Sequence, residues 1–402
     1  MSRGEHSIGR NALFLIGGRV LGGLAALATV ALLTRNLTLQ EFGLYSYALA
    51  LLNLLRVLVG FGGNDVATAE IARAPERRSE TLGALLSLRT LGALSCALAF
   101  AALVSAGAPQ ARGALLLGAP FLLFSAGKAL DPALQAERRF GVIASARLLG
   151  QLAVLVVVGA CVLTESLTLS AAVLAAAAGP ALAQLVVTVR ALRVVRPAWS
   201  WSPRPGLAFL RRSWPQALAT VCGLVTFHVD TLMLHHLEGS LETAVYGAAY
   251  RVFAFAVAIP TLFAAPLLPE MARDVSTRRS LFARGLATVL GGGVLAAAVM
   301  YAVAPLVLRL LADDPPYEAS TDVLRLLFVA LIGFGATSVA GAALVAAGRS
   351  GRWAAVALAA LVLNLVLNVL WIPRHGALGA AQATLVTELV AAVLAVLAAR
   401  RV

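Results

Sequence analysis

Long apolar runs recur along the whole 402-residue chain and are separated by short polar segments. Many of these runs reach the length of about 20 residues that an α-helix needs to cross a hydrocarbon core of about 30 Å. The pattern predicts twelve membrane-spanning helices, over 11–33, 43–63, 81–107, 113–135, 141–163, 169–190, 215–237, 245–268, 282–306, 324–347, 353–372 and 376–398. The predicted fold class is therefore an all-α polytopic membrane protein.

The composition agrees with this pattern. Hydrophobic residues make up 60% of the chain, charged residues 13%, and the mean hydropathy is +0.89, well outside the usage of soluble globular proteins. The net charge of +13 has no soluble basic domain to reside in, so it indicates cytoplasmic loops and not nucleic-acid binding. Cys96, Cys161 and Cys222 all lie within predicted spans, so neither a disulfide framework nor a metal site is expected.

The basic residues alternate from loop to loop. With the N-terminus in the cytoplasm and residues at span ends counted with the adjoining segments, 21 of the 32 Lys and Arg residues fall in cytoplasmic segments, five in outer segments and six deep within spans. The positive-inside rule requires this asymmetry. Both termini are therefore predicted to be cytoplasmic.

The longest cytoplasmic segment lies at the midpoint of the chain and is rich in proline and tryptophan. We expect it to be a linker over 194–206 that joins two six-helix lobes, 1–193 and 207–402. A faint repeat supports the halving, because Glu41–Tyr45 opens the second span and Glu242–Tyr246 opens the eighth, 201 residues later. Two repeats of the same orientation predict lobes related by a pseudo-two-fold axis along the membrane normal.

Six basic side chains lie inside the predicted spans, five of them in the first half of the chain. An ionisable group in a span costs about 2.5–3.5 kcal/mol, so we expect most of the six to face a polar interior. A cationic interior predicts an anionic substrate, and the guanidinium group of Arg suits phosphate because it donates paired hydrogen bonds. The candidate substrate-binding residues are Arg19, Arg56, Arg89, Lys128, Arg147 and Arg251.

Structural alternatives exist for these positions. The arginines of the first and second spans could instead hold a carbonyl group or an asparagine. Arg89 and Arg147 lie near enough to the inner ends of their spans for the long stems to reach the interface. Lys128 and Asp131 are three residues apart on one helix and could neutralise each other.

Three charges are candidates for a gate or a coupling site. Asp230 and Arg251 lie at similar depth on adjacent antiparallel spans, so we expect an ion pair that is either structural or an outer gate. Glu388 lies midway along the last span and would bind a coupling cation or hydrogen-bond a neighbour. Asn364 and Asn368 are one turn apart and are expected to join helices.

Four stretches resemble the polysaccharide biosynthesis (Wzx-type) flippases of the MOP superfamily, the relatives of lipid II flippases and MATE exporters. They are Leu32–Ser46 with Gly60–Gly62; Val229–Leu234 with Val245–Arg251; Ala264–Pro269; and Ala346–Arg349 with Asn364, Asn368, Ile372–Pro373 and Gly376–Ala381. The resemblance implies two six-helix lobes around a central cavity, alternating access, and a place in the bacterial cytoplasmic (inner) membrane. In the lipid II flippase branch, arginines on the first, second and eighth helices are functionally important, and Arg19, Arg56 and Arg251 lie on those helices here.

The resemblance also implies the cargo. It is an oligosaccharide on polyprenyl pyrophosphate, moved from the cytoplasmic to the outer leaflet for the assembly of cell-surface polysaccharide. Membrane lipids, glycosyltransferases and a polysaccharide polymerase would be its partners, and nucleic acid would not. Membrane potential favours export of an anion from a negative interior by about 2.3 kcal/mol per charge per 100 mV.

The residues also bear on two other functions. A MATE-like cation-coupled exporter of small molecules would prefer an acidic cavity, whereas the first half of the chain holds five basic groups and one acidic group within its spans. A polytopic glycan polymerase or ligase would need a large outer loop, and the spans leave none. We find no nucleophile–base–acid set and no nucleotide-binding motif, so neither enzymatic catalysis nor a cofactor is expected.

Overall fold

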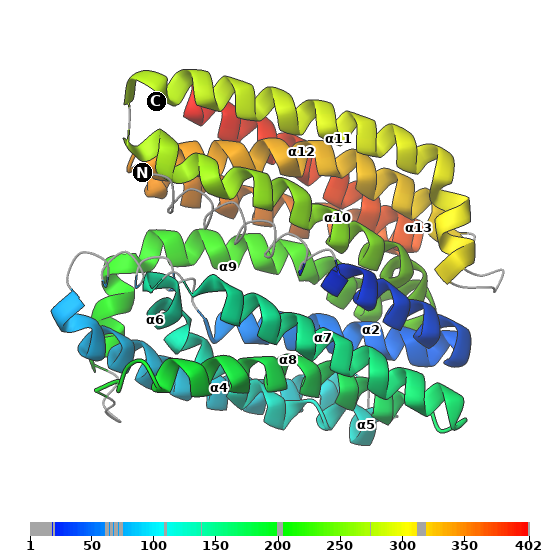
Figure 1. The fold of residues 1–402 in the computed structure, drawn as a ribbon. Helices are drawn as coiled ribbons and strands as arrows, with labels where there is room; N and C mark the ends of the chain where they lie inside the picture. The colour runs from blue at the N-terminus through cyan, green and yellow to red at the C-terminus, as the bar shows by residue number, and fades with distance from the viewer. Residues whose placement is uncertain are drawn as a thin grey trace. The chain divides into compact units, whose positions relative to one another are not determined.

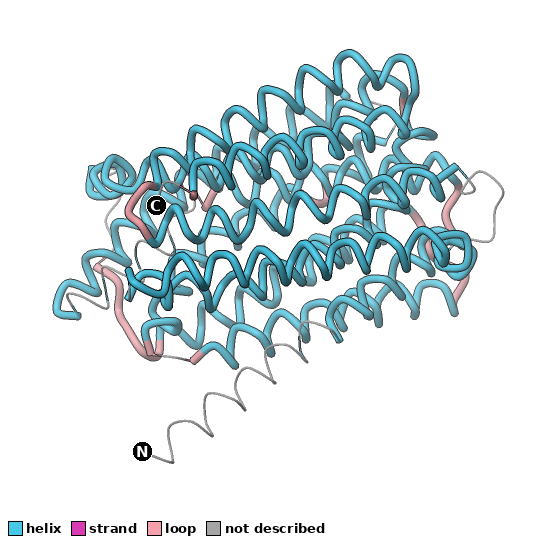
Figure 2. Tube along the Cα trace, turned by 90° about the horizontal axis from the view of Figure 1, so that it is seen from above, coloured by secondary structure: helices cyan, strands magenta, loops and turns pink. Residues whose placement is uncertain are grey.

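The computed structural model describes residues 18, 21–60, 64, 67, 71, 75–107, 111–137, 139–198, 204–273, 275–311 and 319–400. Over these residues the chain forms helices and short connections and no strand (Figure 2). The elements are the helix Leu21–Asn36, α2 Leu39–Leu58, η1 Pro75–Arg77, α4 Arg78–Gly107, α5 Arg112–Leu116, η3 Ala119–Leu130, α6 Asp131–Ala136, α7 Phe140–Leu163, α8 Leu169–Leu192, α9 Arg204–Glu238, α10 Ser240–Arg273, α11 Val275–Leu311, α12 Ser320–Ala346 and α13 Ser350–Ala399 (Figure 1).

Nine helices in the described part of the chain are long and apolar enough to cross a membrane. One of them is the 50-residue α13, whose backbone leaves the helical conformation at Gly376 (φ 55°, ψ −131°). This kink separates the two spans predicted over 353–372 and 376–398. The prediction of an all-α protein with many membrane-spanning helices is confirmed, and the orientation of its ends stays a prediction.

The chain divides into two compact units. Unit 1 comprises Met1–Leu37 and Ala48–Ala217, and unit 2 comprises Thr38–Tyr47 and Leu218–Val402. The first part of α2 thus belongs with unit 2, and the division near Ala217 falls inside α9. The lobe boundaries drawn from the sequence stay a prediction.

The fourth predicted span departs from a regular α-helix. The sequence predicts one helix over 113–135, whereas the structure contains the short α5, a 12-residue 3-10 helix (η3) and the short α6. Runs of 3-10 helix longer than three or four residues are uncommon. One cause is Pro132, which has no N–H to donate and whose ring would clash with the carbonyl of Lys128 in an α-helix. The N–H of Asp131 instead donates to that carbonyl in a tighter turn.

Glycine allows η3 and α7 to pack closely on α8 within unit 1. A Cβ atom at Gly127 of η3 would meet Thr188 Oγ1 of α8 at 2.2 Å, and one at Gly150 of α7 would meet the carbonyl oxygen of Gly179 at 2.6 Å. Small residues at such crossings are what lets membrane helices approach each other. The packing brings the polar residues of η3 against those of α7 and α8.

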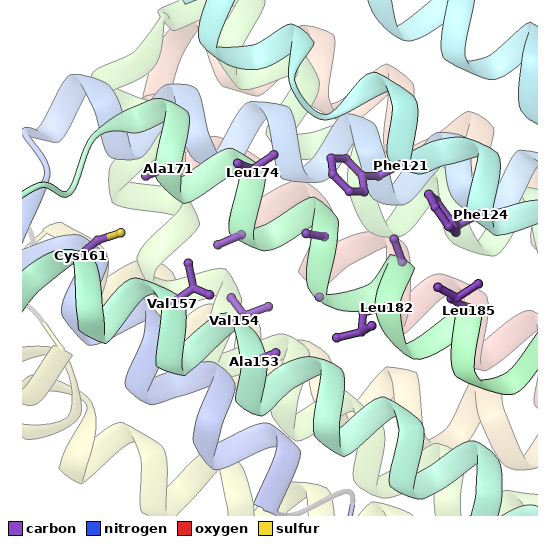
Figure 3. Close-up of a pocket in the computed structure, with 14 residues that line it drawn as sticks. Phe121, Phe124, Ala153, Val154, Val157, Cys161, Ala171, Leu174, Leu182 and Leu185 are labelled. Atoms are coloured by element: carbon purple, nitrogen blue, oxygen red, sulfur yellow. The ribbon is translucent and has the colours of Figure 1, made fainter.

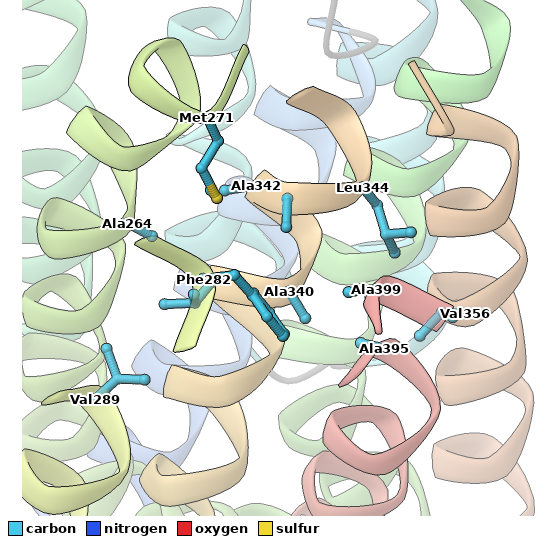
Figure 4. Packing of buried hydrophobic residues seen from close by; sticks show 12 residues of the cluster. Ala264, Met271, Phe282, Val289, Ala340, Ala342, Leu344, Val356, Ala395 and Ala399 are labelled. Carbon is cyan, nitrogen blue, oxygen red and sulfur yellow. The ribbon is translucent and has the colours of Figure 1, made fainter. Parts of the chain in front are cut away.

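Unit 2 packs around α12, which contacts α10, α11 and α13. Met271, Phe282, Val289 and Leu344 lie in one buried cluster, with alanines of α12 and α13 between them (Figure 4). The small side chains keep the helix backbones close, so a cluster of few large residues suffices to fill the space.

The start of the second predicted span lies in unit 2 and packs against the start of α10. Thr38 and Glu41 form a reciprocal capping box at the start of α2, with the N–H of Thr38 3.0 Å from Glu41 Oε2 and the N–H of Glu41 3.3 Å from Thr38 Oγ1. Two residues on, a Cβ atom at Gly43 would meet the carbonyl oxygen of Ser240 at 1.9 Å. The glycine is therefore required for the start of α2 to lie against the start of α10.

Candidate functional site

Four of the predicted substrate-binding cations belong to unit 1 and come from four different elements. Arg56 lies on α2, Arg89 on α4, Lys128 on η3 and Arg147 on α7. Lys128 is within electrostatic reach of the other three and of Asp131. Four cations thus share one region of the unit with one carboxylate.

Arg56 and Arg89 are buried, with 8% and 2% of their surface exposed. Arg56 Nη1 donates to Asn53 Oδ1 at 3.3 Å, and Arg89 Nη2 donates to the carbonyl oxygen of Gly60 at 2.8 Å. The asparagine partner of Arg56 is one that the structural alternative predicted, whereas no carbonyl partner was predicted for Arg89. Whether the stem of Arg89 carries its head toward the interface stays a prediction.

The partners do not satisfy the two guanidinium groups. Arg56 Nη2, Arg89 Nε and Arg89 Nη1 are buried and have no hydrogen-bond partner. Buried polar groups in proteins are nearly always paired, and a charged group without its partners is costly. Three unused donors on two adjacent cations are therefore suited to an acceptor-rich anion such as a phosphate or pyrophosphate.

Asp131 is the one acidic group of this cluster and is 1% exposed. Gln184 Nε2 donates to its Oδ1 at 3.0 Å, and Arg147 Nη2 lies 3.7 Å from its Oδ2. Lys128 was expected to be neutralised by Asp131. The carboxylate instead forms its ion pair with Arg147, and Lys128 remains within electrostatic reach of it. The side chain of Arg147 is 63% exposed, so it is both paired and accessible.

The other two predicted cations lie elsewhere. Arg19 is outside the described residues. Arg251 belongs to unit 2, where its guanidinium carbon lies 5.2 Å from the centroid of the Tyr45 ring. This is the geometry of a cation–π contact.

Asp230 is 2% exposed and is the centre of a second polar cluster, in unit 2. Three neutral groups donate to its carboxylate: Tyr246 Oη at 3.0 Å, Asn368 Nδ2 at 2.6 Å and Thr384 Oγ1 at 2.5 Å. They come from α10 and from both parts of α13. Asp230 therefore joins helices that are far apart in the sequence.

The ion pair expected between Asp230 and Arg251 is not formed. The physical reason is that the three neutral donors already occupy the carboxylate, while Arg251 is held over Tyr45. Glu388, one turn beyond Thr384 on α13, is within electrostatic reach of Asp230.

Sequence reasoning identified Asp230, Glu388 and the two asparagines but not Tyr246 or Thr384 as partners. Asn368 joins α13 to α9 through Asp230, as predicted, and it also donates to Asn364 Oδ1 at 3.0 Å within α13. A signal for Tyr246 was present, because it stands in the repeat that opens the eighth span. Thr384 carries no such signal, since its partner lies 154 residues away.

The described residues contain no group of three or more His, Cys, Asp or Glu side chains that would hold a metal ion. The Asp230 cluster offers a different donor set, of carboxylate, amide and hydroxyl oxygens. Asn368 Oδ1 is buried there without a hydrogen-bond partner. Such oxygens are ligands for hard cations.

The sequence is similar to known families and to a known protein. A family model described as "Polysaccharide biosynthesis protein" matches residues 8–274, and one described as "MatE" matches residues 215–370. The EPS I polysaccharide export inner membrane protein EpsE of Ralstonia solanacearum is 26% identical over 371 residues, which cover 88% of this chain and 85% of that protein.

Solved structures share the fold. The lipid II flippase MurJ in an inward closed conformation superposes with a TM-score of 0.80 at 14% identity, over 97% of this chain and 87% of that one. An inward-facing MATE-family multidrug transporter of the MOP superfamily gives 0.73 at 15% identity, with 97% of each chain covered. A Vibrio cholerae MATE transporter gives 0.70 at 17% identity, over 98% of this chain and 97% of that one.

Proposed function

We propose that this chain, which belongs to the polysaccharide biosynthesis protein family, is a multi-pass inner-membrane transporter of the MOP type that flips a lipid-linked oligosaccharide. The cargo is a glycan on polyprenyl pyrophosphate, and it moves from the cytoplasmic to the outer leaflet by alternating access. Glycosyltransferases would supply this cargo and a polysaccharide polymerase would consume it.

The observation that carries the proposal is the cationic cluster of unit 1. Lys128 is within electrostatic reach of Arg56, Arg89, Arg147 and the carboxylate of Asp131, and two of the guanidinium groups have buried N–H donors without partners. A protein gains no stability from such an arrangement, because unpaired buried charges are destabilising. A pyrophosphate group would supply both the negative charge and the acceptors that the cluster lacks.

Arg147 is exposed, so an arriving headgroup would be able to contact it. Its ion pair with Asp131 is long, at 3.7 Å, and the side chain is largely accessible. An arriving pyrophosphate would compete with Asp131 for Arg147, while the buried Arg56 and Arg89 offer further donors. Binding thus exchanges one ion pair for several charge-assisted hydrogen bonds, each worth about 1.5–3 kcal/mol.

We place the coupling of transport at Asp230. A cation bound at its carboxylate would be held by oxygens of Asn364, Asn368 and Thr384, and the carboxylate would then release some of the three hydrogen bonds that it accepts. Since these bonds tie α9 to α10 and α13, cation binding would change how the helices of unit 2 pack. Coupling of this kind works together with the membrane potential, which favours anion export.

A reconstituted transport assay tests the proposal. Purified protein is inserted into vesicles that contain polyprenyl pyrophosphate carrying a short fluorescent oligosaccharide, and the glycan that reaches the opposite leaflet is measured with an impermeant quencher. We expect faster translocation than in protein-free vesicles. Translocation equal to that of empty vesicles, together with uptake of an organic cation by the same preparation, would replace the flippase by a MATE-like exporter.

A further inference from the structure

A hollow of about 560 Å³ lies between η3, α7 and α8 of unit 1 (Figure 3). Its lining is apolar and includes Phe121 and Phe124 from η3, Val157 from α7, and Leu182 and Leu185 from α8. Val157 is 46% exposed and Leu182 is 49% exposed, so the hollow is open along one side. Neither the cationic cluster nor the Asp230 cluster uses it.

The hollow continues a stripe of α7 that begins at a cation. Arg147, Val154 and Cys161 are spaced by seven residues, which is close to two full helical turns, so they lie on one face of the helix. Val154 and Cys161 line the hollow, and the side chain of Arg147 is 63% exposed. At 1.5 Å per residue the stripe is about 21 Å long. One end of it is cationic and the rest is apolar.

The wall formed by η3 likewise has an apolar face and a cationic face. In a 3-10 helix, residues three apart lie on one face. Phe121 and Phe124 therefore share a face of η3, and their rings stack with centroids 6.3 Å apart over the hollow. Ser125 and Lys128 share the next face, where Lys128 reaches the cationic cluster.

The third wall, α8, contributes residues to both the cationic cluster and the apolar hollow. Gln184 holds Asp131 at 3.0 Å, and its neighbour Leu185 lines the hollow. The apolar hollow thus adjoins the cationic cluster on all three of its elements. A ligand that fits both is an anionic amphiphile with its charged head at the cluster and its chain along α7.

We propose that this hollow binds the polyprenyl tail of the lipid-linked glycan while Arg147 and Lys128 hold its pyrophosphate. The inference rests on the proposed function and names the part of the protein that recognises the lipid. Five of the lining residues are alanines of α7 and α8, and their small side chains would leave more room for the methyl branches of a prenyl chain than larger side chains would. The lining alanines are Ala153, Ala171, Ala175, Ala178 and Ala181.

A photoreactive lipid tests the occupant directly. The full-length protein in nanodiscs is irradiated with polyprenyl pyrophosphate that carries a diazirine in its tail, and the labelled peptides are identified by mass spectrometry. We expect label on the hollow-lining parts of α7, α8 and η3, and competition by unlabelled polyprenyl pyrophosphate. Equal competition by excess phosphatidylglycerol would make the hollow a site for ordinary bilayer lipid and overturn the inference, as would label spread evenly over the lipid-facing helices.

Two adjacent valines provide a matched pair of variants. Val157 lines the hollow, whereas Val156 is 67% exposed and does not line it. Val157→Trp should weaken binding of polyprenyl pyrophosphate at least about tenfold, since displacing two methylene-sized contacts is sufficient for that change. Val156→Trp should leave the affinity unchanged. Equal effects of the two substitutions would contradict a tail site.

A short-chain ligand separates this inference from the proposed function. Val157→Trp should leave the affinity for a soluble short-chain prenyl pyrophosphate within about twofold of the unchanged protein, because its head contacts remain. Loss of affinity for both ligands would assign the hollow a structural role. If the tail binds as described but no glycan is translocated, the flippase proposal fails and the tail site stands.

Discussion

Arg56 has one hydrogen-bond partner, an asparagine three residues earlier on the same helix, and a buried Nη2 with none. Its role as a cation in a span was predictable from one sequence, because the cost of a charge in the membrane applies wherever the residue occurs. An asparagine partner was predicted as one alternative, but contacts between residues far apart in the sequence were not predictable. Asp131, for example, is held by Gln184, 53 residues away, and such long-range contacts leave no mark in a single sequence.

Replacing Arg56 should separate function from stability. Arg56→Met keeps the apolar stem and removes the charge, so we expect glycan export per protein molecule to fall roughly 10- to 100-fold, as the loss of a charge-assisted hydrogen bond implies. The midpoint of thermal unfolding should stay or rise, since an incompletely paired buried charge is removed. Arg56→Lys should restore export in part, because it keeps the charge without the paired donors.

The control is Arg77→Ala, whose side chain is 71% exposed and whose ion pair with Glu80 lies at the surface. Surface pairs contribute little, and export should not change. A drop in unfolding temperature for Arg56→Met, with export unaffected, would make Arg56 a structural residue.

Asp230→Asn tests the coupling site. The amide has the shape of the carboxylate and can keep contacts with Tyr246 and Thr384, whose hydroxyl groups can turn, but it removes the charge that would attract a cation. We expect translocation in vesicles to lose its response to an imposed Na⁺ or pH gradient. Asp322→Asn, at a side chain that is 71% exposed, should keep that response. An unchanged response in the Asp230 variant would exclude this residue from coupling.

At the scale of elements, apolar periodicity located the spans but not their internal geometry. The run 113–135 has the length and hydropathy of one span, and the structure confirms a span there, yet its centre is a 3-10 helix. The prolines and glycines that favour a 3-10 helix can be read from the sequence. Whether α-helical or 3-10 hydrogen bonds form also depends on the packing of η3 against α8. The division of α13 at Gly376 was predictable, because a short polar break separates its two apolar runs.

Gly376 gives an element-scale prediction. Its φ of +55° is strained for any L side chain, and a Cβ atom would lie 2.3 Å from Glu242 Oε2, the group that accepts from the N–H of Ala377 at 2.7 Å. Gly376→Ala should therefore lower the free energy of unfolding by more than the roughly 1 kcal/mol typical of backbone strain alone.

Gly348 supplies the matched case, since its φ is +72° and a Cβ atom there would meet nothing within 4 Å. Gly348→Ala should show the strain without the collision. Equal losses in chemical denaturation of the two variants would mean that the contact with Glu242 contributes nothing.

At the scale of the whole molecule, the alternating basic loops predict both termini in the cytoplasm. Reporter fusions check this. A fusion after Gly239 should report the outer side of the membrane, and one after Arg278 the cytoplasmic side. Reversed signals would invert the topology, and with it the side from which a headgroup reaches Arg147.

The make-up of the two compact units depends on contacts that a single sequence does not reveal. Charge and proline content suggested a break near the middle of the chain, whereas Thr38–Tyr47 of α2 belongs with unit 2. That membership depends on contacts such as Gly43 with Ser240 and Arg251 with Tyr45, which join residues about 200 positions apart. Local patterning contains no information about them.

The central claim is that the cationic cluster of unit 1 holds a pyrophosphate, and a binding measurement tests it most directly. The affinities of polyprenyl pyrophosphate and of uncharged polyprenol are compared for the unchanged protein, Arg56→Ala, Arg89→Ala and the exposed control Arg77→Ala. We predict that the two buried-site variants bind the pyrophosphate at least about tenfold more weakly while their affinity for polyprenol is unchanged, and that the control binds both lipids normally. Unchanged pyrophosphate affinity in both variants would contradict the account.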